Sequence, residues 1–140
     1  MKNPIKNIHF LFQILSISLF PFMITFAIYL HLNGETSPGG GFVSGIMIAT
    51  AFIMISIGFN NVKISFYQIN ILSAIFMLLY LCLGVCGIIF RNSILDYSFF
   101  AIFKINLIKS QQIGIMIVET CVMFVVSSSA YTIYKRFISH

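Results

Sequence analysis

The chain has 140 residues, of which 59% are hydrophobic and only 8% are charged. An ordinary soluble domain is about 45–50% apolar and about 25% charged, so this composition excludes a water-soluble globular fold. It also excludes intrinsic disorder, which requires low hydrophobicity and high charge. The net charge of +5 comes from scattered basic side chains rather than from one basic face, which argues against nucleic acid as a partner.

Three long stretches of the chain contain no charged residue, namely 7–34, 36–62 and 64–90. Each exceeds the roughly 20 apolar residues that cross a bilayer as a helix. The sequence therefore predicts a single all-α membrane domain covering residues 1–140. Its four transmembrane helices are expected at about residues 8–32, 41–59, 68–90 and 111–134.

The first span is predicted to be a retained membrane helix. Its run of about 25 residues is too long for a signal peptide, and no small-residue cleavage site ends it. The connection between the third and fourth spans, residues 91–110, is itself rich in apolar side chains. Ser93 is followed three residues later by Asp96, which resembles a capping box and favours a short helix lying in the membrane interface.

Basic residues in the short connections favour an orientation with both termini in the cytoplasm. One side of the membrane would carry Lys2, Lys6, Lys63, Lys135 and Arg136, and the other side would carry Arg91, Lys104 and Lys109.

The most distinctive segment joins the first two predicted spans and reads Gly34-Glu-Thr-Ser-Pro38-Gly39-Gly40-Gly41-Phe42-Val-Ser-Gly45. A dinucleotide loop would need a strand before these glycines, whereas a membrane helix precedes them, so no nucleotide cofactor is predicted. Glycines allow positive φ and close backbone approach, and Gly41 and Gly45 form a GxxxG step that lets a second helix come near. Two interpretations stay open: a tight reversal, or backbone that packs against another protein of a complex or lines a cavity at the membrane edge.

Glu119 is the first candidate for chemistry, because it lies eight residues into the fourth predicted span, or about 12 Å along the helix. A carboxylate at the bilayer centre costs about 2.5–3.5 kcal/mol on insertion scales, so this side chain should avoid lipid. Its helical stripe is small or polar enough for a packed face and includes Gln112, Met116, Met123, Ser127 and Ala130. Glu119 is interpreted either as an anchor bonded to another helix or as part of a proton or cation path.

His31 and Glu35 are expected at the membrane edge, where ionisable residues are common. His31 is interpreted as a snorkelling helix-end residue or as a ligand or proton relay, and Glu35 as a further ion-path candidate. The three cysteines, Cys82, Cys86 and Cys121, lie in apolar runs without the second pair that a metal site requires. We interpret them as small buried apolar side chains, and we predict no metal site and no disulfide.

These residues resemble the B subunit of Mrp-type multisubunit sodium/proton antiporters. The resemblance rests on Gly34-x-x-x-Pro38-Gly39-Gly40-Gly41-Phe42-x-x-Gly45 between the first two of four short spans, and on Gly114-Ile-Met-Ile-Val-Glu119 in the last. Glu35 stands where many members of that family carry His.

The resemblance implies a multi-pass subunit of a bacterial inner-membrane complex that exchanges cytoplasmic Na⁺ for external H⁺. It implies a transporter component without a cofactor rather than an enzyme. Its partners would be the lipid bilayer and the other, different subunits of the complex, of which the large ones hold the main proton channels. This chain would be an obligatory assembly partner that lines part of the ion path or only supports it.

Two alternatives stay open. The same module occurs in complex I-like redox complexes and membrane-bound hydrogenases, and the sequence does not separate these from antiport. A self-contained four-helix homodimeric transporter, similar to the small multidrug resistance proteins, would keep an essential Glu in its first span. This chain has no carboxylate there and no tryptophan.

Overall fold

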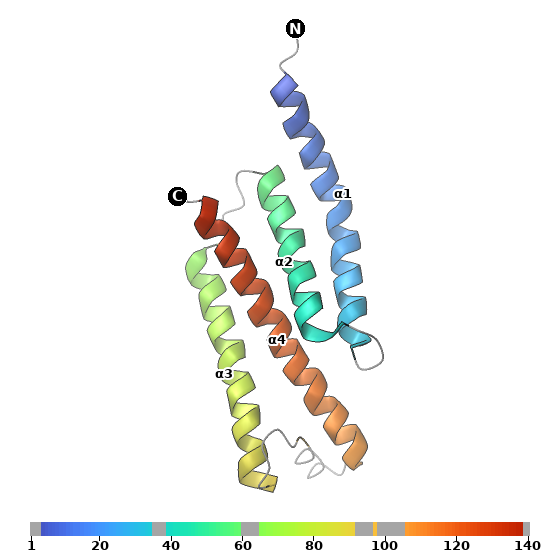
Figure 1. Ribbon diagram of the computed structural model, residues 1–140, viewed down its shortest axis with the longest axis vertical. Coiled ribbons are helices and arrows are strands. Elements are labelled where there is room, and N and C mark those ends of the chain that lie inside the picture. The colour runs from blue at the N-terminus through green and yellow to red at the C-terminus, as the bar shows by residue number, and fades with distance from the viewer. Residues whose placement is uncertain (1–3, 35–38, 60–64, 92–96, 98–105, 139–140) are drawn as a thin grey trace.

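The computed structural model describes residues 4–34, 39–59, 65–91, 97 and 106–138. These residues form four helices that are long and apolar enough to cross a membrane. The prediction of an all-α protein with four transmembrane helices is therefore confirmed. Figure 1 shows them as α1 (Pro4–Leu32), α2 (Gly40–Gly58), α3 (Phe66–Arg91) and α4 (Leu107–Ile138).

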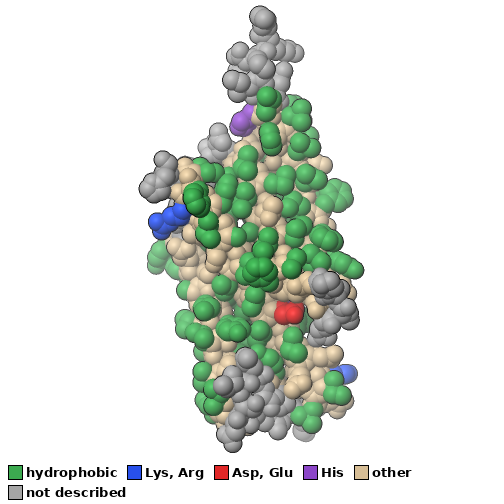
Figure 2. Space-filling model, viewed as in Figure 1, with side chains coloured by type: hydrophobic (Ala, Val, Ile, Leu, Met, Phe, Trp, Pro, Cys, Tyr) green, Lys and Arg blue, Asp and Glu red, His purple; other side chains and the backbone are tan. Residues whose placement is uncertain are grey.

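The four helices are arranged as an open row rather than as a closed bundle. Helix α2 packs between α1 and α4, and α4 packs between α2 and α3, so that α1 and α3 form the two edges (Figure 1). Large apolar side chains are exposed on every helix, among them Phe22 (69%) and Leu78 (62%). They cover much of the face seen in Figure 2. In a membrane, these faces must meet lipid tails or other membrane helices.

Small residues allow α1 and α2 to pack closely. The Ser16 hydroxyl is buried and lies 2.7 Å from the carbonyl oxygen of Phe12 in its own helix and 2.9 Å from that of Met54 in α2. A β-carbon on Gly58 would lie 2.9 Å from the same hydroxyl oxygen. Other fully buried positions on α1 and α2 are the small residues Ala27, Ala49 and Ala51. Small residues and interhelical hydrogen bonds are what hold helices together in lipid, where burial of apolar surface gives no advantage.

Helix α4 extends beyond the predicted span at both ends, because it begins at Leu107 rather than at 111 and ends at Ile138 rather than at 134. The apolar pattern marks only the part of a helix in hydrocarbon, whereas backbone hydrogen bonds continue into the polar interface. The predicted interfacial helix falls on residues that lie mostly outside the described part of the chain. One described residue of this connection is Tyr97, which is buried against Gly114. The carbonyl oxygen of Tyr97 accepts a hydrogen bond of 2.9 Å from the hydroxyl of Ser110.

The cysteine prediction is correct for Cys121, which is buried in α4, and wrong for Cys82, which is exposed. Helix α3 forms an edge of the row, so much of its surface has no neighbouring helix within the described chain. An apolar run does not reveal which of its faces points outward.

The two hairpins are staggered along the row. The end of α1 and the start of α2 lie level with the middle of α4, and the first turns of α4 continue past them (Figure 1). The start of α1 and the end of α4 lie toward the same end of the row. This stagger determines what surrounds Glu119.

Candidate functional site

The carboxylate of Glu119 lies against the turn that joins α1 to α2. A β-carbon placed on Gly34 would lie 2.7 Å from Oε2 of Glu119, and one placed on Gly40 would lie 3.2 Å from Oε1. A β-carbon on Gly41 would overlap the backbone carbonyl oxygen of Glu119. The three glycines thus leave open the space that this residue occupies.

The start of α2 has a backbone that favours glycine. Among the described residues, Gly40 is the one glycine with a positive φ, of 69°, a conformation that side chains other than glycine adopt with strain. Ser44, one turn later, is buried, and its hydroxyl lies 2.9 Å from the carbonyl oxygen of Gly40 and 3.1 Å from that of Gly41. The Ser44 hydroxyl therefore donates within its own helix, and the contact of α2 with Glu119 is made by the glycines.

Gly41 and Gly45 face the backbone of α4. A β-carbon on Gly45 would lie 2.7 Å from the carbonyl oxygen of Met123, one turn after Glu119. The GxxxG step on α2 therefore matches two successive turns of α4, and the helix that approaches it belongs to the same chain. Phe42, in the same motif, is 58% exposed and points away from this contact.

His31 reaches α4 from the last turn of α1. Its Nε2 lies 3.1 Å from Oγ1 of Thr120, and the Thr120 hydroxyl lies 2.8 Å from the carbonyl oxygen of Met116, to which it donates. The Thr120 oxygen must then accept a hydrogen bond from Nε2, which places the proton of a neutral imidazole there. Nδ1 of His31 is buried and has no hydrogen-bond partner among the described residues.

His31 and Glu119 line one cavity of about 240 Å³. Its walls are His31, Leu32, Gln112, Ile113, Met116 and Glu119. A water molecule takes up about 30 Å³ in the liquid, so a cavity of this size with an imidazole, an amide and a carboxylate has room for several waters. The arrangement can bind water, a proton or a small cation.

Glu119 is partly exposed, and it is the only acidic residue in the described part of the chain. An acidic side chain, in red, is visible on the face seen in Figure 2. It lies twelve residues after the start of α4, or about 18 Å along the helix axis. A carboxylate is thus partly accessible from outside the chain within a helix that is apolar enough to span the membrane.

The predicted packed stripe on α4 is wrong for its first two members. Gln112 is exposed and Met116 is 54% exposed, whereas Met123 and Ser127 are half-buried. The stagger explains the difference, because α1 ends and α2 begins near the level of Glu119, so the first turns of α4 have no described helix on that side.

The structure thus brings together five of the residues singled out in the sequence: Glu119, His31, Gly34, Gly40 and Gly41. Gly39 packs instead on α1, where its β-carbon would lie 3.2 Å from the carbonyl oxygen of Leu30. Glu35 and Pro38 lie outside the described residues. Sequence reasoning missed Thr120, although a hydroxyl beside a carboxylate within an apolar span was a signal for it. In the described part of the chain, no group of three or more His, Cys, Asp or Glu side chains is placed to hold a metal ion.

Comparison with known proteins gives one family and several distant relatives. Residues 11–132 match the family described as "Domain related to MnhB subunit of Na+/H+ antiporter". The B subunit of an Na(+)/H(+) antiporter of Alkalihalophilus pseudofirmus is 35% identical over 60 residues, which cover 43% of this chain and 41% of that protein. A putative antiporter subunit mnhB2 of Staphylococcus aureus (strain Newman) is 40% identical over 38 residues, or 27% of each chain.

The chain therefore aligns with less than half the length of these curated relatives. No solved structure matches it. The family match covers most of the chain, including α2, α3 and the glycine and Glu119 motifs. The protein is a member of the family of domains related to the MnhB subunit of Na⁺/H⁺ antiporters.

Proposed function

We propose that this protein is a small membrane subunit of a multisubunit monovalent cation/proton antiporter, with Na⁺ and H⁺ as the exchanged ions. In this proposal it is an obligatory assembly partner for other, different subunits in a bacterial inner membrane. Its own part in transport is the site formed by Glu119 and His31.

The observation that carries this proposal is the partly exposed carboxylate of Glu119. A charge facing lipid at this depth would cost about 2.5–3.5 kcal/mol on insertion scales. The carboxylate therefore needs water, a proton, a cation or a polar group of another subunit. A neighbouring subunit that covers the cavity would provide a polar passage between the two chains, with Glu119 and His31 on its wall.

The open row of helices supports the assembly role. Helix α1 packs mainly on α2 and helix α3 mainly on α4, and large apolar side chains remain exposed on all four helices. Helices in lipid gain stability from close packing and hydrogen bonds, and much of this surface has neither within the chain. Other subunits would supply both.

His31 gives the site a second group that can exchange a proton. His31 lines the cavity that Glu119 also lines, and its imidazole is a group that can carry a proton. Release of that proton as a cation reaches the carboxylate would couple the two ions at one site.

The test is Glu119→Gln, measured in native membranes together with the amount of assembled complex. Glutamine keeps the shape and hydrogen bonding of a protonated Glu but cannot release a proton or neutralise a cation. We expect normal assembly with lost or pH-shifted Na⁺-driven proton flux. Normal flux in the intact variant would leave Glu119 as a packing anchor. Glu35→Gln, measured in the same way, tests the other acidic ion-path candidate.

A second experiment addresses a self-contained homodimeric transporter. The purified chain alone in liposomes should not exchange Na⁺ for H⁺, and exchange by it would refute the proposal that it works only within a complex. A component of a redox-linked complex is the remaining alternative. Purification of the complex from its native membrane distinguishes the two, because iron–sulfur subunits would accompany a redox complex.

A further inference from the structure

Helices α3 and α4 extend farther than α1 and α2 at one end of the row. His31, in the last turn of α1, contacts Thr120, and Gly40, at the start of α2, lies against Glu119. Helix α4 begins twelve residues before Glu119, or about 18 Å farther along its axis. Figure 1 shows α3 and α4 both continuing past the end of α1. The end of α1 and the start of α2 therefore lie in a recess beside α3 and α4.

The ends of α3 and α4 that extend past this recess are apolar. Ile89 and Phe90 at the end of α3 are exposed, and so are Leu107 and Ile108 at the start of α4. Side chains of this kind favour hydrocarbon over water. The apolar part of the membrane therefore reaches past the end of α1, and the recess lies below the membrane surface.

The backbone in the recess is not helical throughout and needs polar partners. Gly34 follows the end of α1 and Gly39 precedes α2, and both are only half-buried, so the protein does not enclose them. Helix α2 begins without a side-chain cap, and the N–H groups of its first turn need acceptors that the helix does not supply. Irregular backbone at membrane depth is tolerated only where protein buries it or where it lines a water-filled cavity. We infer that water reaches this level, which is the level of Glu119.

The cavity that Glu119 and His31 share extends into the recess. Two of its lining residues, Met116 and Ile113, lie three and six residues before Glu119 on α4, or about 9 Å toward the start of that helix. The cavity therefore runs from Glu119 in the direction in which α3 and α4 extend past the other two helices.

In the opposite direction, toward the chain termini, α1, α2 and α4 pack closely. Ala27 of α1 and Ser44 and Ala49 of α2 are fully buried. A β-carbon on Gly45 would lie 2.7 Å from the carbonyl oxygen of Met123, so no water fits between α2 and α4 at this point. The described helices thus block the way from Glu119 toward the termini.

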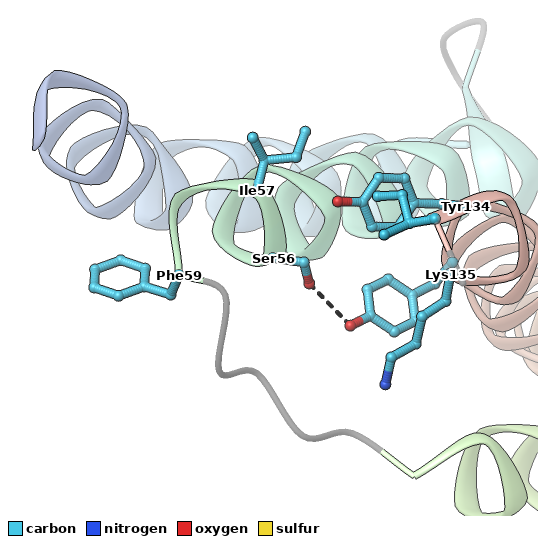
Figure 3. A pocket seen from close by; sticks show the side chains of 7 residues that line it. Ser56, Ile57, Phe59, Tyr134 and Lys135 are labelled. Atoms are coloured by element: carbon cyan, nitrogen blue, oxygen red, sulfur yellow. Dashed lines mark hydrogen bonds between the residues drawn. The ribbon is translucent and has the colours of Figure 1, made fainter. Parts of the chain in front are cut away.

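A separate cavity lies at the end of the row that carries the termini. It measures about 490 Å³, and Figure 3 shows Ser56 in its wall, where the Ser56 hydroxyl is hydrogen-bonded to that of Tyr131 at 2.9 Å. Tyr131 follows Glu119 by twelve residues, so about 18 Å of α4 separates these two residues. The close contact of Gly45 with Met123 lies in this stretch, and the two cavities are distinct.

We propose that the cavity of Glu119 is the inner end of an aqueous vestibule that opens on the side of the membrane opposite the chain termini. This inference rests on the proposed function, and it specifies that a proton or cation held at Glu119 exchanges with that side. Exchange with the side of the termini would require a movement of α2 against α4 or a path supplied by another subunit.

The test is the reaction of introduced cysteines with a positively charged methanethiosulfonate that does not cross membranes. The reagent is applied to intact cells and to inverted membrane vesicles that contain the whole complex. Met116→Cys places a thiol in the cavity wall, whereas Ile115→Cys places one at nearly the same depth on an exposed position outside the cavity. We expect Met116→Cys to react about tenfold faster, because the reagent attacks the thiolate and a thiol in hydrocarbon stays protonated. Ile113→Cys, a second position in the cavity wall, should react like Met116→Cys.

Two controls set the scale and the side of the reaction. The parent chain, with its own three cysteines, provides the background rate. A cysteine added after His140 marks the side of the termini, and Met116→Cys should react from the other side. Equal rates for Ile115→Cys and the two cavity variants, or reaction of the cavity variants from the side of the termini, would overturn the proposal.

The flux of the Glu119→Gln variant separates this inference from the proposed function. Reactive cavity cysteines together with normal flux in Glu119→Gln would leave a vestibule without an ion site, and the proposed function would fail alone. Protected cavity cysteines together with lost flux in Glu119→Gln would keep Glu119 in the ion path and refute the vestibule.

Discussion

Gly41 of α2 touches the backbone carbonyl of Glu119 on α4, so the two helices meet backbone to backbone at the residue that bears the membrane carboxylate. The contact fixes the level of Glu119 relative to the α1–α2 turn. It also ties the helix packing to the site, because any residue larger than glycine at position 41 must move Glu119. A single substitution at Gly41 therefore changes both the α2–α4 contact and the position of Glu119, so each variant needs a matched control.

Gly41→Ala should destabilise the protein by about 1–3 kcal/mol or more, because the new methyl overlaps backbone that has no flexible end to move. A loss of this size lowers the abundance of a membrane protein severalfold. The measurement is the melting temperature in detergent together with the amount of chain in the membrane. Gly84→Ala, within α3 at a partly exposed position, is the control and should be neutral or stabilising. A Gly41→Ala variant as stable as Gly84→Ala would show that α2 and α4 are not in close contact.

Ser16→Leu should separate α1 from α2 at the other end of the hairpin. Ser16 is buried against Gly58 and Met54, and a leucine there has no space. Ser18, two residues later on the same helix, is exposed. Ser18→Leu therefore adds the same side chain to a surface that faces lipid and should be tolerated. Protease sensitivity of the two variants in membranes distinguishes them, and equal sensitivity would contradict the packing of α1 on α2.

Most of the fold was predictable from hydropathy. The charge-free stretches indicated the number of helices and their approximate bounds, because lipid admits only long apolar segments with satisfied backbone hydrogen bonds. The order of the helices in the row was not predictable. It depends on which faces carry Gly41, Gly45 and Ser16, and small residues indicate close contact without naming the partner.

The site was predictable in its residue types but not in its geometry. Glu119 and His31 were both candidates because each is an ionisable residue in or near an apolar span. Their meeting in one cavity depends on the stagger of the hairpins, which places the end of α1 beside the middle of α4. No local pattern encodes a stagger of this kind, since it arises from backbone contacts between segments far apart in the sequence, such as Gly41 and Glu119. The exposure of Met116 follows from the same cause.

The membrane orientation stays a prediction that reporter fusions can test. Fusions after Asn61 and after His140 should both report the cytoplasm, whereas a fusion between residues 35 and 38 should report the opposite side. The reason is the excess of Lys and Arg in the two termini and the second connection. A result with Asn61 and His140 on opposite sides would contradict the four-span arrangement, and a uniform inversion would contradict only the orientation.

His31→Gln tests whether the imidazole takes part in proton exchange. A glutamine amide can still donate to Thr120 Oγ1, so the contact between α1 and α4 should survive, but it cannot take up a proton. The second imidazole nitrogen, Nδ1, has no hydrogen-bond partner among the described residues. If the imidazole takes part in proton exchange, we expect Na⁺-driven proton flux in the variant to lose part of its pH dependence while the complex assembles normally.

The matched control for this experiment is His9→Gln, which makes the same change at an exposed position near the other end of α1. Its pH profile should equal that of the parent, since His9 is far from the cavity that Glu119 lines. If His31→Gln also keeps the parental profile at normal abundance, the imidazole only holds α1 against Thr120. If the His31→Gln and Glu119→Gln variants each shift the profile and the double variant shifts it no further than one of them, the two residues act on the same proton. Additive shifts would instead indicate two independent proton sites, and the shared cavity would then have no role in coupling them.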